Sequence, residues 1–303
     1  MSVLMDGKLV SSNMRETIKN QVEDYKNKYH AVPGLAVVVV GNNPASAVYV
    51  RNKHKACAEV GINSTQIELP ETISENALID KIRCLNTDPD VHGILVQLPL
   101  PKHIDEKKIL SVINPIKDVD AFHPENVGRI MIGNYDFLPC TPAGVMALLD
   151  YYNIDIAGQR VLIIGRSNIV GKPMMHLMLE RNATVMVAHS KTRTDDLWRM
   201  FAKADIVISA TGVRNIIDED DAWQYFKDYR HDFYKDFRVK NDRVIIDVGI
   251  NRDENGKLCG DFAEDFKAKY SSYYTPVPGG VGPMTIISLI EQTVRAFEKR
   301  VNE

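Results

Sequence analysis

The residues with the clearest chemical potential lie on a helix that the sequence predicts for residues 44–60. Asn43 suits the N-cap of this helix, Pro44 its first position and Gly61 the position after its end. At about 100° per residue, one lysine falls on a stripe of uncharged side chains, while its charged neighbours point away. The stripe consists of Tyr49, Lys53, Ala56 and Val60, and the residues that point away are Arg51, His54 and Lys55. A lysine in such a place either extends its amine to solvent or is desolvated, which lowers its pKa and suits proton transfer near neutral pH.

A glutamine interrupts the apolar segment GILVQLPLP, residues 93–101. Gln97 stands just before Pro99 and Pro101, which end the predicted strand at its carboxyl end, where open α/β sheets bind ligands. A buried glutamine must find hydrogen-bond partners, and either Lys53 or a loop backbone can supply them. The sequence alone leaves both partners open.

The loop KDVDAFHPENVGR, residues 117–129, follows this strand and carries several polar side chains. Asp118, Asp120 and His123 cluster there with proline and glycine, a composition that is typical of turns. A carboxylate in this place could instead accept hydrogen bonds from the polar edge of a heterocycle. We expect His123 to be structural.

Residues 160–179, RVLIIGRSNIVGKPMMHLML, predict a strand, a glycine-bearing turn and a helix. Gly165 permits a tight turn off the strand, and Gly171 permits close packing where the helix starts. Arg166 and Ser167 offer donors beside the backbone N–H groups, which at a helix start face an anion. The spacing is not the GxGxxG of the general dinucleotide fingerprint, so a plain turn without a ligand stays an alternative.

The next strand indicates which dinucleotide would fit. Its end and the following residues, HSKTRT, place Ser190, Lys191 and Arg193 where an acid would favour NAD and where hydroxyl or basic groups favour the 2′-phosphate of NADP. An ordinary solvated basic turn is the alternative. Two further strands end in SATG, which contains Thr211 and Gly212, and in DVGIN, and glycine at strand ends permits close approach of a flat ligand.

Composition excludes several classes of protein. The 303-residue chain has 37 Lys and Arg against 40 Asp and Glu and a formal net charge of −3, so it lacks a long-range attraction to nucleic acid or acidic membranes. No segment approaches the roughly 20 apolar residues of a bilayer span, and the first residues lack the apolar run of an export signal. The cysteines lie far apart without a CxxC pair, which predicts neither disulfides nor a metal site and indicates the reducing cytoplasm. They are Cys57, Cys84, Cys140 and Cys259.

The fold class follows from the alternation of apolar runs with helical segments. Short runs rich in Val and Ile predict buried parallel strands at residues 35–40, 94–98, 161–164, 184–188, 206–209 and 244–248. Together with the chain length, this pattern predicts an α/β protein of two domains, connected within residues 117–141. Residues 282–303 carry a helical stripe whose docking partner stays open, and the charged, aromatic segment 218–243 predicts a solvated helical excursion.

Seven motifs together resemble the bifunctional methylenetetrahydrofolate dehydrogenase/methenyltetrahydrofolate cyclohydrolase family. They are VGNNPASAVYVRNKHKA, GILVQLPLP, KDVDAFH, PCTPAG, GRSNIVGKP, DVGIN and TPVPGGVGPMT, and the resemblance spans roughly residues 2–300. It implies an N-terminal α/β folate-binding catalytic domain, residues 1–139 and 284–303, completed by the C-terminal helix. It further implies a Rossmann-type NADP-binding domain, residues 140–283, and a homodimer.

The same resemblance assigns roles to individual residues. Tyr49 and Lys53 match the family's tyrosine and catalytic lysine, Gln97 the glutamine that hydrogen-bonds this lysine, and Asp120 the aspartate that holds the pterin ring. The residues that match the folate and nicotinamide loop are Pro278 and Gly279. Those that match the phosphate-binding turn, the 2′-phosphate contact and a residue beside the cofactor are Gly165, Arg166, Ser167, Ser190 and Ile250.

Two departures from the family pattern stand out. Family members usually have glycine where Ala121 stands beside Asp120. The stretch of residues 213–243 is also longer than the usual connection between SATG and the DVGIN strand. Neither departure removes a residue that is assigned to chemistry.

The implied function is NADP-dependent oxidation of methylenetetrahydrofolate to methenyltetrahydrofolate, then hydrolysis to 10-formyltetrahydrofolate, within the one-carbon metabolism that serves purine, methionine and histidine biosynthesis. One alternative is another two-domain NADP oxidoreductase, similar to shikimate dehydrogenase, which does not account for GILVQLPLP with KDVD. The other is a catalytically silent NADP-binding protein that docks partners through residues 218–243. Intact Tyr49, Lys53, Gln97 and Asp120 argue against a silent protein.

Overall fold

The computed structural model describes residues 2–41, 44–217 and 242–302, and the side chains of residues 44–49 are also left out of the description. The chain divides into two units, a first one of Ser11–Ala143 with Thr285–Glu303 and a second one of Met1–Val10 with Gly144–Met284. The unit boundaries fall inside helices α1 (Gly7–Tyr29), α6 (Cys140–Tyr151) and α12 (Val281–Val301). Residues 1–10, which the sequence placed with the catalytic domain, group with the second unit instead. The reason is that β1 (Val3–Leu4) pairs with β11 (Tyr273–Tyr274).

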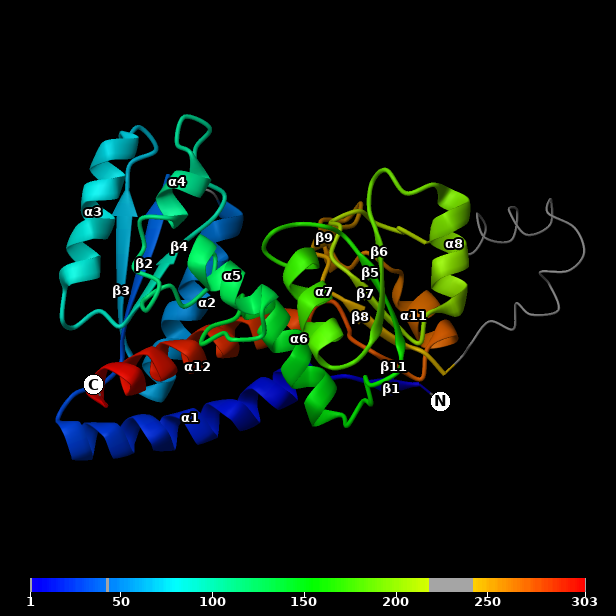
Figure 1. The fold of residues 1–303 in the computed structure, drawn as a ribbon, viewed down its shortest axis with the longest axis horizontal. Coiled ribbons are helices and arrows are strands. Elements are labelled where there is room, and N and C mark those ends of the chain that lie inside the picture. Colours follow the sequence, from blue (N-terminus) through cyan, green and yellow to red (C-terminus); the bar gives the residue numbers. More distant parts are fainter. Residues whose placement is uncertain (1, 42–43, 218–241, 303) are drawn as a thin grey trace, which may run out of the picture. The chain divides into compact units, whose positions relative to one another are not determined.

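The first unit is built on a three-stranded parallel sheet with the order β3-β2-β4 (Figure 1). Strands β2 (Gly34–Val40) and β4 (Gly93–Val96) confirm two predicted strands, and nearly every residue in them is buried. Strand β3 (Asn63–Leu69) was not predicted, since it lies at the edge and its sequence, NSTQIEL, has few apolar residues to mark it. Edge strands expose one side and need no continuous apolar run.

Helices α2 (Pro44–Val60), α3 (Glu75–Thr87), α4 (Glu106–Leu110) and α5 (Pro124–Met131) complete the first unit. The predicted helix of residues 44–60 is confirmed, and Gly61 ends it with a φ of 83°, while the expected N-cap Asn43 lies outside the described residues. Apolar residues of β2, β4 and α3 form the core together with the segment that follows β4. Lys117 is buried and donates to the carbonyls of Leu85 and Asp88, which caps the end of α3.

The C-terminal helix α12 supplies a further wall of the first unit. Its predicted apolar stripe is confirmed, because Ile287, Ile290, Val294 and Phe297 are all at most 3% exposed. The ring of Phe297 meets the His92 ring edge-on at 4.9 Å between centroids. The segment thus docks where the sequence alone could not place it.

The second unit contains a six-stranded parallel sheet with the order β1-β11-β8-β7-β5-β6. Its predicted strands are confirmed as β5 (Arg160–Ile164), β6 (Thr184–Ala188), β7 (Ile206–Ser209) and β8 (Val244–Asp247). Because β5 lies between β6 and β7, the order reverses beside the first strand of this series, and such switch points bind ligands at the carboxyl ends of the strands. Helices α7 (Gly171–Glu180), α8 (Thr194–Lys203) and α11 (Glu264–Tyr270) accompany the sheet, and a short antiparallel pair joins β9 (Asn251–Arg252) with β10 (Leu258–Cys259).

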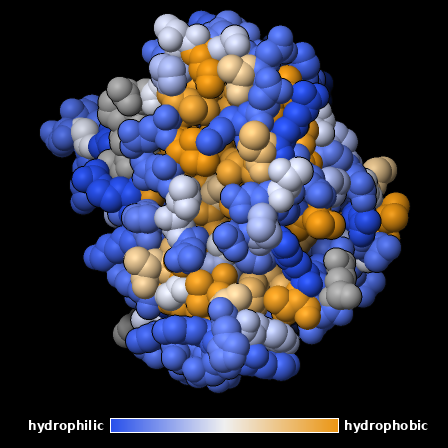
Figure 2. Space-filling view, turned by 90° about the vertical axis from the view of Figure 1, so that its left-hand side faces the viewer, coloured by the Kyte–Doolittle hydropathy of each residue, from blue (hydrophilic) through white to orange (hydrophobic). Residues whose placement is uncertain are grey.

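The surface is mixed in character. On the face shown in Figure 2, hydrophilic residues dominate and hydrophobic residues come to the surface in patches between them.

None of the helices in the described ranges is both long enough and apolar enough to cross a bilayer. The predicted helical excursion of residues 218–243 falls almost entirely outside the described residues.

His92 should remain neutral well below its usual pKa. Burial, aided by the charges of Arg300 and Lys117, lowers the pKa of its imidazole from 6.5 to about 4, and its Nδ1 accepts a hydrogen bond from the backbone N–H of Gly34 at 3.0 Å. As the pH falls, the imidazole is therefore protonated in the unfolded chain before it is protonated in the folded protein. The contribution of neutral His92 to the free energy of unfolding is complete above pH 6.5 and is lost as the pH falls towards 4. We expect the protein to lose about 1 kcal/mol of unfolding free energy through this group as the pH falls from 7.5 to 5.5.

His92→Gln, which cannot titrate, should lose correspondingly less unfolding free energy over that range when both proteins are denatured in urea. Nuclear magnetic resonance of the parent should show no titration of the His92 ring until near pH 4. Parallel pH dependences of the two proteins, or a ring that titrates near pH 6.5, would contradict the burial argument.

Candidate active site

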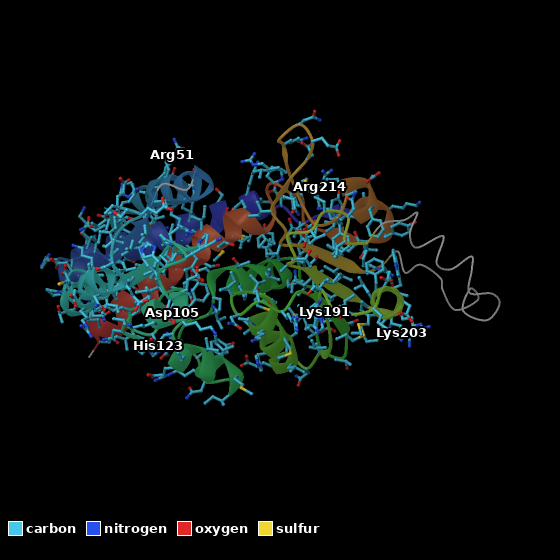
Figure 3. The ribbon with its side chains drawn as sticks, turned by 90° about the horizontal axis from the view of Figure 1, so that it is seen from above. Arg51, Asp105, His123, Lys191, Lys203 and Arg214 are labelled. Carbon is cyan, nitrogen blue, oxygen red and sulfur yellow. The ribbon has the colours of Figure 1, made fainter. Side chains whose placement is uncertain are left out.

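The stripe of α2 that carries Lys53 faces the interior of the first unit. Lys53 is 7% exposed, and Ala56 and Val60 are buried with it. The neighbours that were expected to point away do so, among them Arg51, which is exposed on α2 (Figure 3). Tyr49 lies on the same helix, but its side chain is outside the described part of the structure. Of the two outcomes considered for Lys53, the structure shows desolvation.

Gln97 is a direct partner of this lysine. Its side-chain oxygen accepts a hydrogen bond from Lys53 Nζ at 3.1 Å, and its amide nitrogen donates to the carbonyl of Leu98 at 2.8 Å. Both partners considered for Gln97 are therefore used at once. Because glutamine is neutral, it orients the amine without adding a charge that would stabilise the protonated form.

Burial lowers the pKa of the Lys53 amine, while the carboxylate of Asp120 acts in the opposite direction. Two cysteines, Cys57 and Cys140, also interact with Lys53. Burial raises the pKa of Cys57 to about 11 and that of Cys140 well above its usual value. Both thiols are therefore protonated at neutral pH, and of these three groups only the amine has a pKa that burial shifts towards neutrality.

Asp120 is held by the start of α6. Its carboxylate accepts a hydrogen bond from the backbone N–H of Cys140 at 3.0 Å. Gln292 of α12 joins the segment of Asp120 to the segment of Cys140. Its amide nitrogen donates to the carbonyls of Val119 and Leu138, both at 2.8 Å, and its oxygen accepts from the N–H of Leu138. Gln292 was not among the residues predicted from the sequence, where its one signal was a polar side chain on the apolar side of the last helix.

The remaining polar residues of this loop are structural. Asp118 is 1% exposed and accepts from the backbone N–H of His123 and the side chain of Asn126, while burial raises its pKa. His123 caps α5, because its Nδ1 accepts from the N–H of Glu125. The structural role expected for His123 is confirmed, and of the acidic pair only Asp120 is partly exposed.

In the second unit, β5 leads into the predicted phosphate-binding turn. Gly165 adopts a φ of 130°, and a Cβ there would stand 2.7 Å from the carbonyl oxygen of Ala210. A Cβ on Gly171 would stand 2.3 Å from the Gly165 carbonyl, so both glycines are needed for the tight turn. Arg166 is exposed beside it, whereas Ser167 Oγ accepts from the N–H groups of Val170 and Gly171 and so shapes the turn itself.

The basic residues after β6 form an exposed turn. Ser190 and Lys191 are exposed. Arg193 pairs with Asp196 at 3.0 Å and with Asp195 at 3.3 Å, both in the first turn of α8. Lys191 is thus the cation of this turn best presented to a phosphate, with Arg193 partly engaged by its own helix.

A buried aspartate fixes the turn after β7. Asp261 is 0% exposed and accepts from Ser209 Oγ, from Thr211 N and from Thr211 Oγ1 at 2.7–2.8 Å. Thr211 therefore turns its hydrogen-bonding groups inward, and Gly212, with a φ of 66° and open space around it, is the exposed part of this turn. Sequence analysis did not select Asp261.

The last predicted residues of the second unit lie in two other loops. Ile250 is 54% exposed, an unusual exposure for an isoleucine that follows a buried strand. Pro278 is exposed, and Gly279 is buried with a φ of 112°, which a side chain would strain. A glycine turn at a helix start, an exposed lysine and an exposed apolar side chain at neighbouring strand ends fit the phosphates and the flat ring of a dinucleotide.

Comparisons with known proteins match each of the two units to a domain of the same enzyme family. The catalytic domain described as "Tetrahydrofolate dehydrogenase/cyclohydrolase" matches residues 5–120, and the NAD(P)-binding domain of the same description matches residues 139–224 and 230–301. "Bifunctional protein FolD" of Acetivibrio thermocellus is 51% identical over 293 residues, which cover 97% of this chain and 96% of that protein.

Solved structures give the same result. The bifunctional enzyme FolD from Campylobacter jejuni superposes with a TM-score of 0.90 at 46% identity, covering 99% of this chain and all of that one. The Trypanosoma brucei methylenetetrahydrofolate dehydrogenase-cyclohydrolase, complexed with NADP cofactor and inhibitor, gives a TM-score of 0.90 at 35% identity and covers all of this chain and 99% of its own. This chain therefore belongs to the tetrahydrofolate dehydrogenase/cyclohydrolase family.

Proposed function

We propose that this chain oxidises methylenetetrahydrofolate with NADP+ and then hydrolyses the product to 10-formyltetrahydrofolate, with Lys53 as the proton carrier. The observation that carries the proposal is a buried amine with a lowered pKa, oriented by the neutral amide of Gln97. In this proposal, residues 1–139 and 284–303 hold the folate, and residues 140–283 hold the dinucleotide, with residues 1–10 paired to the latter through β1.

Each reaction uses a different property of the site. Bound NADP+ supplies the hydride acceptor, and the protein's part in that step is to orient the folate, for which Asp120 offers a carboxylate to the polar edge of the pterin ring. In the hydrolysis, water adds to the cationic bridge carbon and the bond from that carbon to N5 breaks. Neutral Lys53 accepts a proton from the water and returns one to N5, so that one proton is released overall.

The two alternatives are weaker. A shikimate-dehydrogenase-like enzyme would leave the Lys53–Gln97 pair without an evident use, and the family assignment covers both units rather than the dinucleotide-binding one alone. A silent binding protein would have no need to bury a lysine, which is costly unless a function retains it. We further propose a homodimer in the cytoplasm with no nucleic-acid or membrane partner, in line with the near-neutral charge.

The direct test is activity of the purified protein. With methylenetetrahydrofolate and NADP+ under reducing conditions, NADPH absorbance should rise, and methenyltetrahydrofolate absorbance should fall when that compound is supplied alone. Shikimate with NADP+ should give no signal. Absence of both folate reactions, in a protein that is folded by circular dichroism, would rule out the proposed function.

Lys53→Met should abolish the hydrolysis while the fold and NADP binding persist. The substitution keeps much of the apolar stem and removes the proton carrier, so we expect at least about a 100-fold loss in the rate of methenyltetrahydrofolate hydrolysis. Dehydrogenase activity should fall less, because hydride transfer takes no proton from the lysine.

Lys55→Met provides the matched control, since Lys55 is an exposed lysine on the same helix. Its hydrolysis rate should equal that of the parent. If folded Lys53→Met protein hydrolyses methenyltetrahydrofolate at the parent rate, the assignment of Lys53 is wrong.

Lys191→Ala should weaken NADP binding and leave NAD binding nearly unchanged. Loss of a charge-assisted contact to the 2′-phosphate should raise the Kd for NADP about 10-fold at low salt. Lys203→Ala serves as the control, because Lys203 is an exposed lysine at the opposite end of α8 (Figure 3). Calorimetric titration with both dinucleotides measures the effect, and equal losses for NADP and NAD would refute a 2′-phosphate contact.

A further inference from the structure

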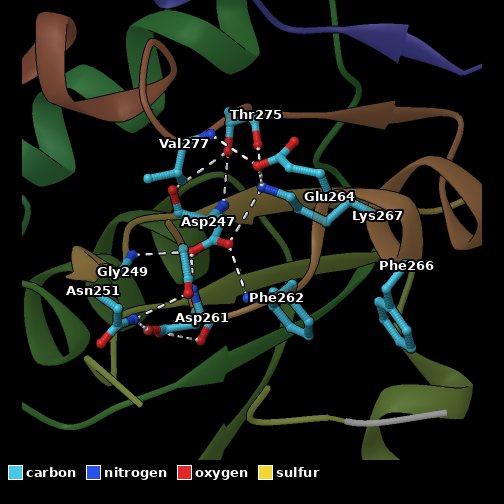
Figure 4. A network of polar contacts seen from close by, with 12 residues as sticks. Asp247, Gly249, Asn251, Asp261, Phe262, Glu264, Phe266, Lys267, Thr275 and Val277 are labelled. Carbon is cyan, nitrogen blue, oxygen red and sulfur yellow. Dashed lines mark hydrogen bonds and ion pairs between the residues drawn. The ribbon is translucent and has the colours of Figure 1, made fainter. Parts of the chain in front are cut away.

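A largely buried polar network joins the three loops of the second unit that carry predicted ligand-binding residues. Figure 4 shows its links around Asp247, Asp261 and Lys267. These loops are residues 209–212 at the end of β7, residues 247–251 at the end of β8 and residues 275–279 after β11. The network is supplied by a fourth segment, residues 260–267, which sequence analysis did not connect with any ligand. We call it the bracing segment.

Asp261 of the bracing segment joins the first two loops. Its carboxylate accepts from Ser209 and Thr211 of one loop and, at 3.0 Å, from the side-chain nitrogen of Asn251 in the other. A Cβ on Gly249 would stand 2.0 Å from Asp261 Oδ1, so the second loop lies directly against this carboxylate.

The network continues from Asp261 to the third loop. The backbone N–H groups of Asp261 and Phe262 donate to the carboxylate of Asp247, which also receives Lys267 Nζ at 3.4 Å. Lys267 donates in turn to the carbonyl of Thr275 at 2.8 Å and to Glu264 at 2.7 Å. Glu264 accepts from the N–H of Val277, the residue before Pro278, at 3.0 Å.

The burial of these groups indicates a purpose beyond folding. Asp247, Asp261 and Lys267 are at most 1% exposed, and buried charges are generally no better for stability than apolar side chains of similar volume. What a fully hydrogen-bonded buried carboxylate does provide is one defined geometry for every segment that donates to it. Here the donors belong to loops that end neighbouring strands, where a dinucleotide binds.

We propose that Asp261 is a positioning residue for the dinucleotide, which sets the loops of residues 209–212 and 247–251 so that Gly212 and Ile250 face the ligand. This inference rests on the proposed function and extends it to residues that do not touch the ligand. It predicts that the affinity for the dinucleotide depends on Asp261, whereas chemistry at Lys53, in the first unit, does not.

The test compares Asp261→Asn with the parent enzyme and with Asp265→Asn. Asparagine has the same shape but cannot accept from both loops, so the KM and Kd for NADP should rise about 10-fold, with little change in kcat at saturating NADP. Asp265→Asn is the same substitution at an exposed position of the bracing segment and should behave as the parent. Hydrolysis of methenyltetrahydrofolate, which uses no dinucleotide, should be unchanged in both variants, a separation that general structural damage would not produce.

Ser209→Ala gives a milder version of the test, should Asp261→Asn fail to fold. It removes one donor from the Asp261 carboxylate and should raise the KM for NADP about threefold. If a folded Asp261→Asn protein binds NADP like the parent, the inference is wrong and the proposed function still stands. The same holds for Ser209→Ala if only that variant folds. An equal loss of hydrolysis and NADP affinity also overturns the inference. A parent enzyme that does not bind NADP contradicts the proposed function, and the inference falls with it.

Discussion

Keeping a primary amine out of water is the constraint on which the first unit depends. A buried ammonium is strongly disfavoured, so Lys53, at 7% exposure, is shifted towards its neutral form. The fold must then offer a partner that orients the amine without restoring its charge, and Gln97 at the end of β4 does so. The carboxylate of Asp120 acts in the opposite direction and favours the protonated amine, so burial and a nearby charge compete at this one group.

The candidate site residues lie largely on loops, which need other contacts to fix their conformation. In each unit, a buried polar side chain provides such contacts. Gln292 of α12 fixes the segments of Val119 and Leu138, and through them the carboxylate of Asp120. In the second unit, Asp261 fixes the loops after β7 and β8 by the same means. Gln292 is distant in sequence from both segments it holds, and Asp261 is distant from the loop after β7. The geometry of both candidate sites therefore depends on buried side chains outside the loops that form them.

The sequence predicted most of the regular structure and part of the site. The strands that are buried on both faces could be predicted from their runs of Val and Ile. The stripe on α2 singled out Lys53 as a charged residue on a buried face. Strand β3 escaped because an edge strand needs no apolar run. Gln292 and Asp261 were not predicted for a different reason. The role of a lone buried polar residue depends on the hydrogen-bond partners that folding brings to it, and these are not visible in the sequence. Periodicity reports which face is buried, not what a buried polar atom will meet.

Ala121 stands where the resemblance to the family led us to expect glycine. Its φ of 53° favours glycine, because a left-handed conformation costs a non-glycine residue roughly 1–2 kcal/mol. The methyl group is 0% exposed, however, and burying it returns about 0.8 kcal/mol, which offsets part of that cost. The neighbouring carboxylate keeps its place in this loop, since Asp120 accepts from the N–H of Cys140 at 3.0 Å.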